Sequence, residues 1–292
     1  MNDDELLSDY VGAVALAWDG SFGRDRVRLH HGRDHDVVIV GREAAFRFPT
    51  HRRAHYALPR EVAALAALGT AGDIGVVLPT VVVDCSGATL GKAFVGQRFL
   101  DGEPLPRSAV DAVGPMAFRF AFEIGRVLDA MREVPLDGHL AHVLHEAPLR
   151  ATFPDLADAV RALVSERLSP TGRDRADREL DAALDAAAGA TPTLVHGDFT
   201  GGNLLWDADD TRLTGVLGWT QVHAGDTAYD VASLAATYGW DLAATVAETL
   251  DRDDPTMLER ARAYAATFAL QAAYGALTVG DEDAAAEALR GY

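Results

Sequence analysis

Short runs of apolar residues, separated by polar turns, fill the first third of the chain. Two such runs, DVVIV and AAFRF, lie between Asp36 and Phe48 and flank Gly41-Arg42-Glu43. This spacing predicts a β-hairpin, because a short loop containing glycine can adopt the positive φ that tight turns require. Further strand-like runs at 76–84 and around 92–100 extend the expected sheet.

One helical pattern interrupts these strand-like runs. Pro59 can open a helix at its first position, and Gly69 can cap it. This interpretation places Glu61 in the first turn. The apolar positions recur at intervals of three and four, as expected of a helix with one buried face: Leu58, Val62, Leu65 and Leu68.

After residue 107 the pattern becomes mainly helical. The segment FLDGEPLPR, 99–107, combines Gly, Pro and charge, which is typical of a connection. We therefore expect an α+β fold with a mainly β N-lobe at 1–100, a hinge at 101–107 and a mainly α C-lobe at 108–292. Helical patterns cover 155–190, 258–274 and 281–290, and one expected buried face comprises Phe118, Phe122, Gly125, Leu128 and Met131.

Composition supports two packed lobes in an aqueous compartment. The 292 residues, 49% hydrophobic and 24% charged, suit a chain that folds throughout. No apolar stretch approaches the ~18 residues of a membrane helix, and the acidic N-terminus lacks signal-peptide features. We expect a cytoplasmic protein without membrane contact. The single Cys85 excludes an internal disulfide framework and is interpreted as a buried structural thiol.

Acidic residues outnumber basic ones by 44 to 26, giving a net charge of −18. Such a field repels nucleic acid and attracts cationic solutes, although acidity also serves solubility. Three histidines, His30, His31 and His35, occupy a polar loop. Without nearby cysteine or carboxylate partners in the pattern, we interpret them as solvated rather than metal-binding.

Chemistry-bearing residues gather where the helical period breaks, between 191 and 233. The segment LVHGDFTGGNLLWDADDTRLTGVLGWTQVHAGDTAYDVASL contains HGD, an asparagine five residues after the aspartate, and GDTAYD. This order resembles the catalytic region of the aminoglycoside and macrolide phosphotransferases, relatives of protein kinases. The C-terminal RARAYAATFALQAAYGAL with GDED is also similar to viomycin-type phosphotransferases. The resemblance implies a bilobal, protein-kinase-like fold.

The resemblance also assigns roles within the HGD loop. Phosphoryl transfer requires cations near the phosphates, metal ligands and a carboxylate that orients the attacking hydroxyl. Asp198 would accept the proton of that hydroxyl, and Asn203 would offer its amide oxygen to Mg²⁺. His196 would brace the loop. Asp226 and Asp230 would either brace this region or line the substrate side, and the sequence does not separate these readings.

Upstream, GRDHDVVIVGREAAFRFPTHRRAHYALPREVAAL is similar to the family's phosphate loop, third strand and following helix. Strand alternation places Arg47 on the face opposite Phe46 and Phe48. The resemblance implies that Arg47, where the family usually has lysine, pairs with phosphate oxygens and with Glu61. A surface arginine on an edge strand is the alternative. Gly32 marks the expected phosphate loop by position alone.

Two positions depart from the family pattern. Leu217-Gly218-Trp219 replaces the family's Ile-Asp-Trp, and that aspartate normally bridges the Mg²⁺ ions. Arg132 stands where the family commonly has histidine, with an effect that the sequence leaves open. The expected partners are a nucleotide, ATP or GTP, Mg²⁺ and a small cationic molecule.

These observations favour an ATP- or GTP-dependent phosphotransferase acting on a hydroxyl of a small cationic antibiotic, or of a related metabolite. The antibiotic would be aminoglycoside-, macrolide- or tuberactinomycin-like. The alternative is a pseudokinase that binds such a ligand or a nucleotide without transfer, because Gly218 lacks a carboxylate. Oligomeric state and a role in resistance have no signature in the sequence.

Overall fold

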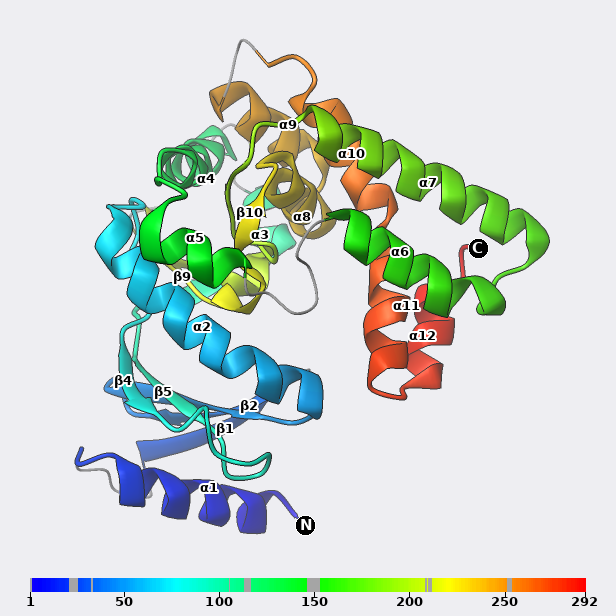
Figure 1. The fold of residues 1–292 in the computed structure, drawn as a ribbon. Coiled ribbons are helices and arrows are strands. Elements are labelled where there is room, and N and C mark those ends of the chain that lie inside the picture. The colour runs from blue at the N-terminus through cyan, green and yellow to red at the C-terminus, as the bar shows by residue number, and fades with distance from the viewer. Residues whose placement is uncertain are drawn as a thin grey trace.

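A computed structural model describes residues 2–20, 26–32, 34–104, 106–112, 117–145, 153–207, 209, 212–250 and 254–292. The N-terminal region contains a five-stranded antiparallel sheet, and the rest is mainly helical (Figure 1). This arrangement confirms the predicted α+β class. The sheet has the order β1-β2-β3-β5-β4: β1 Val27–His31, β2 His35–Val40, β3 Ala44–Pro49, β5 Val95–Arg98 and β4 Val81–Asp84.

The predicted hairpin is formed by β2 and β3. Val40 pairs with Ala44, so residues 41–43 make the loop, and Gly41 has φ 55°. Helix α1, Asp3–Ala17, covers the sheet face opposite the one covered by α2, Arg52–Ala71 (Figure 1). On the α1 side, Tyr10 stacks on Phe48 with ring centroids 4.0 Å apart.

Helix α2 begins earlier than predicted. His51 caps it, because its Nδ1 accepts a hydrogen bond from the Ala54 backbone at 3.2 Å. The prediction that Pro59 opens the helix is therefore wrong, and Glu61 lies well inside the helix rather than in its first turn. Pro59 is exposed, so the helix forgoes one backbone donor on its solvent side.

The C-terminal region is built around a continuous apolar core. Its strands form two small sheets: β6 Glu103–Pro104, β8 Leu204–Asp207 and β9 Arg212–Val216 in one, β7 Thr193–Val195 and β10 His223–Gly225 in the other. Residue 105 of the expected hinge lies outside the described residues. The helices are α3 Arg107–Ala112, α4 Ala117–Arg132, α5 Gly138–His145, α6 Phe153–Val164, α7 Pro170–Gly189, α8 Ala228–Tyr238, α9 Trp240–Leu250, α10 Met257–Ala266, α11 Phe268–Thr278 and α12 Glu282–Ala288.

The buried face of α4 agrees in part with the predicted one. Gly125, Leu128 and Met131 are buried as predicted, but Phe118 and Phe122 are 59% and 54% exposed. Gly125 lies against α9, where a Cβ would meet Thr249 Oγ1 at 2.2 Å. At the end of α4, Arg132 Nη1 donates to the Leu250 carbonyl at 3.2 Å, which ties α4 to the end of α9.

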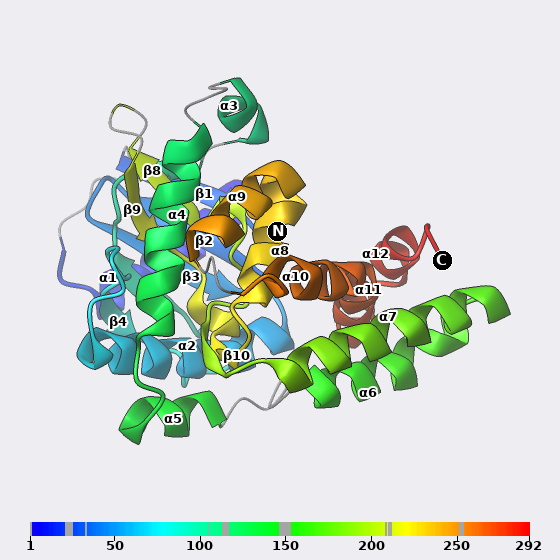
Figure 2. The same ribbon diagram turned by 90° about the horizontal axis from the view of Figure 1, so that it is seen from above.

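A second apolar core joins α6, α7, α11 and α12 (Figure 2). These four helices extend together to one side of the molecule. Leu270 and Ala273 place one face of α11 in this core. Cys85, predicted to be buried, is only partly so, and partial burial beside Asp84 raises the pKa of its thiol. No described helix combines the length and apolar character that a membrane crossing requires.

Candidate active site

The HGD loop follows β7 and is held by a buried histidine. His196 is fully buried, its Nε2 donates to the Leu217 carbonyl at 2.8 Å, and its Nδ1 accepts from the Asp198 backbone N–H at 3.2 Å. These partners require a neutral ring with the proton on Nε2. Burial lowers the pKa of His196 to about 4, which agrees with that state. His196 thus links the loop to the strand end that precedes Gly218.

Asp230 supports the same loop from α8. Its carboxylate accepts hydrogen bonds from the backbone N–H groups of His196, at 2.8 Å, and Gly197, at 2.9 Å. Gly197 has φ 81°, a conformation that glycine adopts without strain. Burial raises the pKa of Asp230 to about 7, while the two backbone donors oppose the rise. The structure places Asp230 beneath the loop, fully buried.

Asp198 and Asn203 are brought together by a short 3₁₀ turn at Gly201–Asn203. Asn203 Nδ2 donates to the Asp198 carbonyl at 2.8 Å and to Asp198 Oδ2 at 2.9 Å. Its Oδ1 is therefore directed away from Asp198. Asp198 is partly exposed, whereas its neighbours Gly197 and Phe199 are buried.

Gly218 faces Asn203 directly. It has φ 77° and ψ 42°, and a Cβ at this position would lie 2.7 Å from Asn203 Oδ1. Gly218 occupies the position where the family has aspartate. This position therefore lies beside Asn203, the expected metal ligand. For Mg²⁺, Asp198 offers a carboxylate and Asn203 an amide oxygen, but Gly218 offers no side-chain oxygen. The described residues therefore do not form the family's complete Mg²⁺ site, and they contain no other cluster of three or more metal-binding side chains.

The predicted contact between Arg47 and Glu61 is present. Arg47 Nη1 on β3 donates to Glu61 Oε1 on α2, and Glu61 is 1% exposed. Arg47 Nη2 also contacts His35 Nδ1 at 3.3 Å. Because a guanidinium only donates, Nδ1 is the acceptor and the His35 proton is on Nε2. Arg47 is thus a part-buried cation on a central strand that joins the sheet to α2, not a surface arginine on an edge strand.

One of the loop histidines does not lie as expected. His35 is buried, and burial beside Arg47 lowers the pKa of its ring to about 3, so the solvated interpretation is wrong for this residue. His31 is exposed as expected, although its Nδ1 lies 2.7 Å from Asp36 Oδ1. Gly32 lies in the β1–β2 turn, where its backbone N–H donates to the His35 carbonyl at 2.9 Å.

A cavity of about 780 Å³ opens beside Asp198, between α2 and the helices α8, α11 and α12. Among the described residues, its wall includes Asp198 and His35 but not Arg47, Glu61 or Asn203. Arg47 and Glu61, the pair expected near the phosphates, and Asn203, the expected Mg²⁺ ligand, therefore lie outside the wall of this cavity. Their mutual contacts turn them inward, toward the sheet and the loop.

Arg60 links the two halves of the site, and no sequence pattern predicts this role. From α2, its Nη1 donates to the Thr220 carbonyl at 2.8 Å and its Nη2 to the Val222 carbonyl. The side chain thus attaches α2 to the segment that follows Gly218. Only the tertiary fold makes this link visible, because Arg60 and Thr220 are separated by 160 positions.

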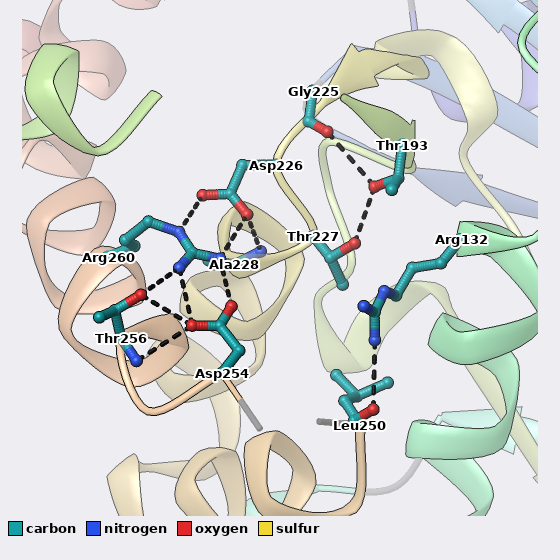
Figure 3. A network of polar contacts seen from close by, with 10 residues as sticks. All are labelled: Arg132, Thr193, Gly225, Asp226, Thr227, Ala228, Leu250, Asp254, Thr256 and Arg260. Atoms are coloured by element: carbon teal, nitrogen blue, oxygen red, sulfur yellow. Dashed lines mark hydrogen bonds and ion pairs between the residues drawn. The ribbon is translucent and has the colours of Figure 1, made fainter. Parts of the chain in front are cut away.

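Asp226 is held by an ion-pair network behind the site (Figure 3). Arg260 on α10 donates to Asp226 Oδ2 at 2.8 Å and to Asp254 Oδ2 at 2.9 Å. The Ala228 backbone N–H donates to Asp226 Oδ1 at 3.0 Å. These hydrogen bonds from Arg260 lower the pKa of Asp254 to about 2. Asp226, with its side chain 5% exposed, braces the start of α8.

Comparison with known proteins now decides the family. The profile of the phosphotransferase enzyme family matches residues 25–264. The chain belongs to this phosphotransferase family. It is also 34% identical to viomycin phosphotransferase of Streptomyces vinaceus over 291 residues, which cover 98% of this chain and 95% of that protein.

Solved structures of phosphotransferases share the fold. The GDP and kanamycin complex of the aminoglycoside phosphotransferase APH(2″)-IIIa superposes with a TM-score of 0.80 at 20% identity, covering 96% of this chain and 95% of that one. Macrolide 2′-phosphotransferase MphH of Brachybacterium faecium gives a TM-score of 0.69 at 20% identity, covering 99% and 98%. The predicted kinase-like bilobal fold is confirmed.

We expect the Arg260 network to contribute strongly to the stability of this phosphotransferase. Replacing Arg260 by Gln leaves the Asp226 carboxylate buried without its cation, which should lower the free energy of unfolding by about 3–5 kcal/mol. Arg262→Gln is the control, because Arg262 is exposed and lies over the Trp240 ring at 4.3 Å; it should cost about 1 kcal/mol or less. Urea denaturation measures both. Equal losses would contradict a structural role for the network.

The His196 ring should remain neutral down to about pH 4, well below its ordinary pKa of 6.5. Between these values the native state binds fewer protons than the unfolded chain. This residue's contribution to stability is therefore lost as the pH falls through that window, up to about 3 kcal/mol. A pH titration followed by ¹⁵N NMR of the imidazole ring would report both the charge and the tautomer of His196. A midpoint near 6.5, or a proton on Nδ1, would contradict the assigned hydrogen bonds.

Proposed function

We propose that this phosphotransferase transfers the γ-phosphoryl group of ATP or GTP to a hydroxyl of a small cationic antibiotic or related metabolite. The observation that carries the proposal is the position of Asp198. Its carboxylate stands on a loop fixed by His196 and Asp230, and it opens onto a cavity large enough for a small molecule. Family membership supplies the reaction class.

In this reaction Asp198 orients the acceptor hydroxyl and accepts its proton. The hydroxyl oxygen forms a bond to the γ-phosphorus while the bond to the nucleoside diphosphate oxygen breaks. The products are a phosphate ester and a nucleoside diphosphate, and the proton leaves Asp198 for solvent. Arg47, fixed by Glu61, supplies positive charge on the nucleotide side, and Gly32 belongs to the turn that approaches the phosphates.

The comparisons support nucleotide use without choosing the base. Fold neighbours are described as a GDP and kanamycin complex and as a streptomycin-ATP ternary complex. The net charge of −18 favours the approach of a cationic acceptor over long distances. Asn203 can contribute one oxygen toward Mg²⁺, but no catalytic step is assigned to the metal because Gly218 leaves its ligand set incomplete.

Gly218 favours a second candidate function, in which the chain binds nucleotide or acceptor without transfer. The rest of the site retains its hydrogen bonds, so binding and chemistry can separate here. A turnover assay with ATP and GTP, in the presence of Mg²⁺, distinguishes an enzyme from a pseudokinase.

Replacing Asp198 by Asn should lower kcat by about 10²–10⁴-fold while leaving nucleotide affinity nearly unchanged, because Asp198 addresses the acceptor hydroxyl. Asp34→Asn is the matched control. It makes the same change of charge in the same cavity, at a carboxylate that accepts from His51 Nε2 at 3.0 Å. Steady-state kinetics measures kcat, and calorimetry measures nucleotide affinity. Parallel loss of nucleotide binding and turnover in Asp198→Asn alone would show that the proposed role is wrong.

Replacing Gly218 by Asp should raise Mg²⁺-dependent nucleotide affinity by about tenfold or more, because it adds a carboxylate ligand beside Asn203. Gly218→Asn is the control, since asparagine has the same shape and also tolerates positive φ but carries no charge. Both side chains must displace the Asn203 amide, because a Cβ at this position would lie 2.7 Å from its Oδ1, 2.9 Å from its Cγ and 3.0 Å from its Nδ2.

Thermal denaturation of both Gly218 variants checks the fold, and calorimetry with ATP and GTP, with and without Mg²⁺, measures binding. A parent protein that already binds Mg²⁺-nucleotide tightly and turns over would show that other groups hold the metal. Equal affinities of the Asp and Asn variants would lead to the same conclusion.

A further inference from the structure

One face of α11 presents apolar side chains to the cavity beside Asp198. The cavity-lining positions on and just after this helix are Phe268, Gln271, Ala272, Gly275, Ala276 and Val279, of which only Gln271 has a polar side chain. Their spacing of three and four places them on one helical face. The opposite face, with Leu270 and Ala273, is buried in the second core. The apolar face toward the cavity is open: Val279 is 43% exposed, and Ala272 is also exposed.

Two polar residues that line the cavity, Tyr229 on α8 and Gln271 on α11, are hydrogen-bonded to each other. Tyr229 donates from its hydroxyl to Gln271 Oε1 at 2.9 Å, and Gln271 Nε2 donates to Thr267 Oγ1 at 2.9 Å. The Tyr229 and Phe268 rings pack edge to face, with centroids 5.5 Å apart. The α11 wall therefore offers mainly carbon atoms, and its polar groups are already hydrogen-bonded to one another.

The carboxylates that line the cavity already accept hydrogen bonds from other groups of the protein. Asp34 accepts from His51 Nε2 at 3.0 Å, and Asp281 caps α12 by accepting from the Ala284 backbone at 2.9 Å. Asp198, which accepts from Asn203, is the third carboxylate among the described lining residues. Two guanidinium groups, those of Arg53 and Arg60, line the same cavity.

An acceptor with several ammonium groups would meet an unsuitable surface here. Each desolvated ammonium requires a paired carboxylate or several acceptor atoms. The wall at α11 supplies methyl, methylene and aromatic carbon instead, and α2 supplies positive charge. The net charge of −18 belongs to the whole chain, and its effect on a bound ligand is screened beyond about 8–10 Å.

The end of the cavity that approaches the sheet has a different chemistry. His35 lines the cavity there, is 7% exposed, and carries a proton on Nε2 that has no acceptor among the described residues. A buried N–H without a partner favours an acceptor-rich group nearby, such as a phosphate. The cavity thus has a donor-rich end at the sheet and a carbon-rich end at α11, with Asp198 on its wall.

We infer that the acceptor is a hydroxyl compound with a broad apolar face and at most one positive charge, and that the apolar face rests on the α11 wall. This inference rests on the proposed function and narrows its substrate class. The acceptor hydroxyl lies toward Asp198, and its single ammonium group remains near solvent. Transfer forms the phosphate ester as described above, so the inference adds no further chemical step.

Calorimetry on the full chain, with GDP present, compares two probes. Erythromycin has one tertiary amine and a large apolar ring, and kanamycin has several amines on a polar scaffold. Erythromycin should bind at least tenfold more tightly, with an affinity that changes little as salt is raised. Tighter binding of kanamycin would overturn the inference, and so would binding of neither probe.

Wall variants test whether α11 is the contact surface. Phe268→Leu should weaken erythromycin binding several-fold while leaving GDP affinity unchanged. The control Phe122→Leu alters an aromatic residue that is 54% exposed on α4, away from the cavity, and should change neither. Ala272→Asp should shift the preference toward kanamycin by about tenfold, whereas the neutral Ala272→Asn should not. Unfolding midpoints of all variants identify those that fold.

Separate measurements of binding and turnover distinguish a failure of the proposed enzyme activity from a failure of the inferred acceptor class. Erythromycin binding without phosphate transfer would contradict the proposed enzyme activity but support the acceptor class. Phosphorylation of kanamycin with little or no phosphorylation of erythromycin would support the enzyme and overturn the acceptor class.

Discussion

The site depends on a buried carboxylate that holds a backbone turn. Asp230 accepts the N–H groups of both His196 and Gly197, which no strand or helix satisfies. Leaving such donors unpaired inside the protein would cost about 1–3 kcal/mol each. Their pairing orients the loop so that the Asp198 side chain emerges next to the cavity. The position of the proposed catalytic carboxylate is therefore decided by α8, a helix that follows it in the chain.

Two further contacts connect the HGD loop and α2 to the segment around Gly218. His196 joins the loop to the Leu217 carbonyl, directly before Gly218, and Arg60 joins α2 to the carbonyls of Thr220 and Val222. A displacement of α2 thus reaches the segment around Gly218 through one side chain. The left-handed glycine preserves this geometry without a carboxylate, which explains how the scaffold retains its hydrogen bonds although the family's metal ligand is replaced.

Charge acts on two length scales in this molecule. The excess of acidic residues governs the approach of solutes from a distance, whereas individual contacts govern what binds. Around the cavity, Asp34 and Asp281 serve the protein's own hydrogen bonds, and α11 presents carbon. Net charge alone would favour a polycation, but the local surface favours a ligand with fewer charges and more apolar area.

The sequence determined the α+β class, the β2–β3 hairpin and the residues of the HGD loop, because these follow from local periodicity, turn chemistry and short-range motif order. It also identified the Arg47 and Glu61 pair through resemblance. It misplaced the start of α2, which His51 caps, and it wrongly counted Phe118 and Phe122 among the buried residues of α4, because both features depend on how the helices pack. Arg60, Arg260 and the α11 wall have functions only in the folded chain. Their partners lie up to 162 positions away, and such distances are closed by packing of the whole core rather than by any local pattern.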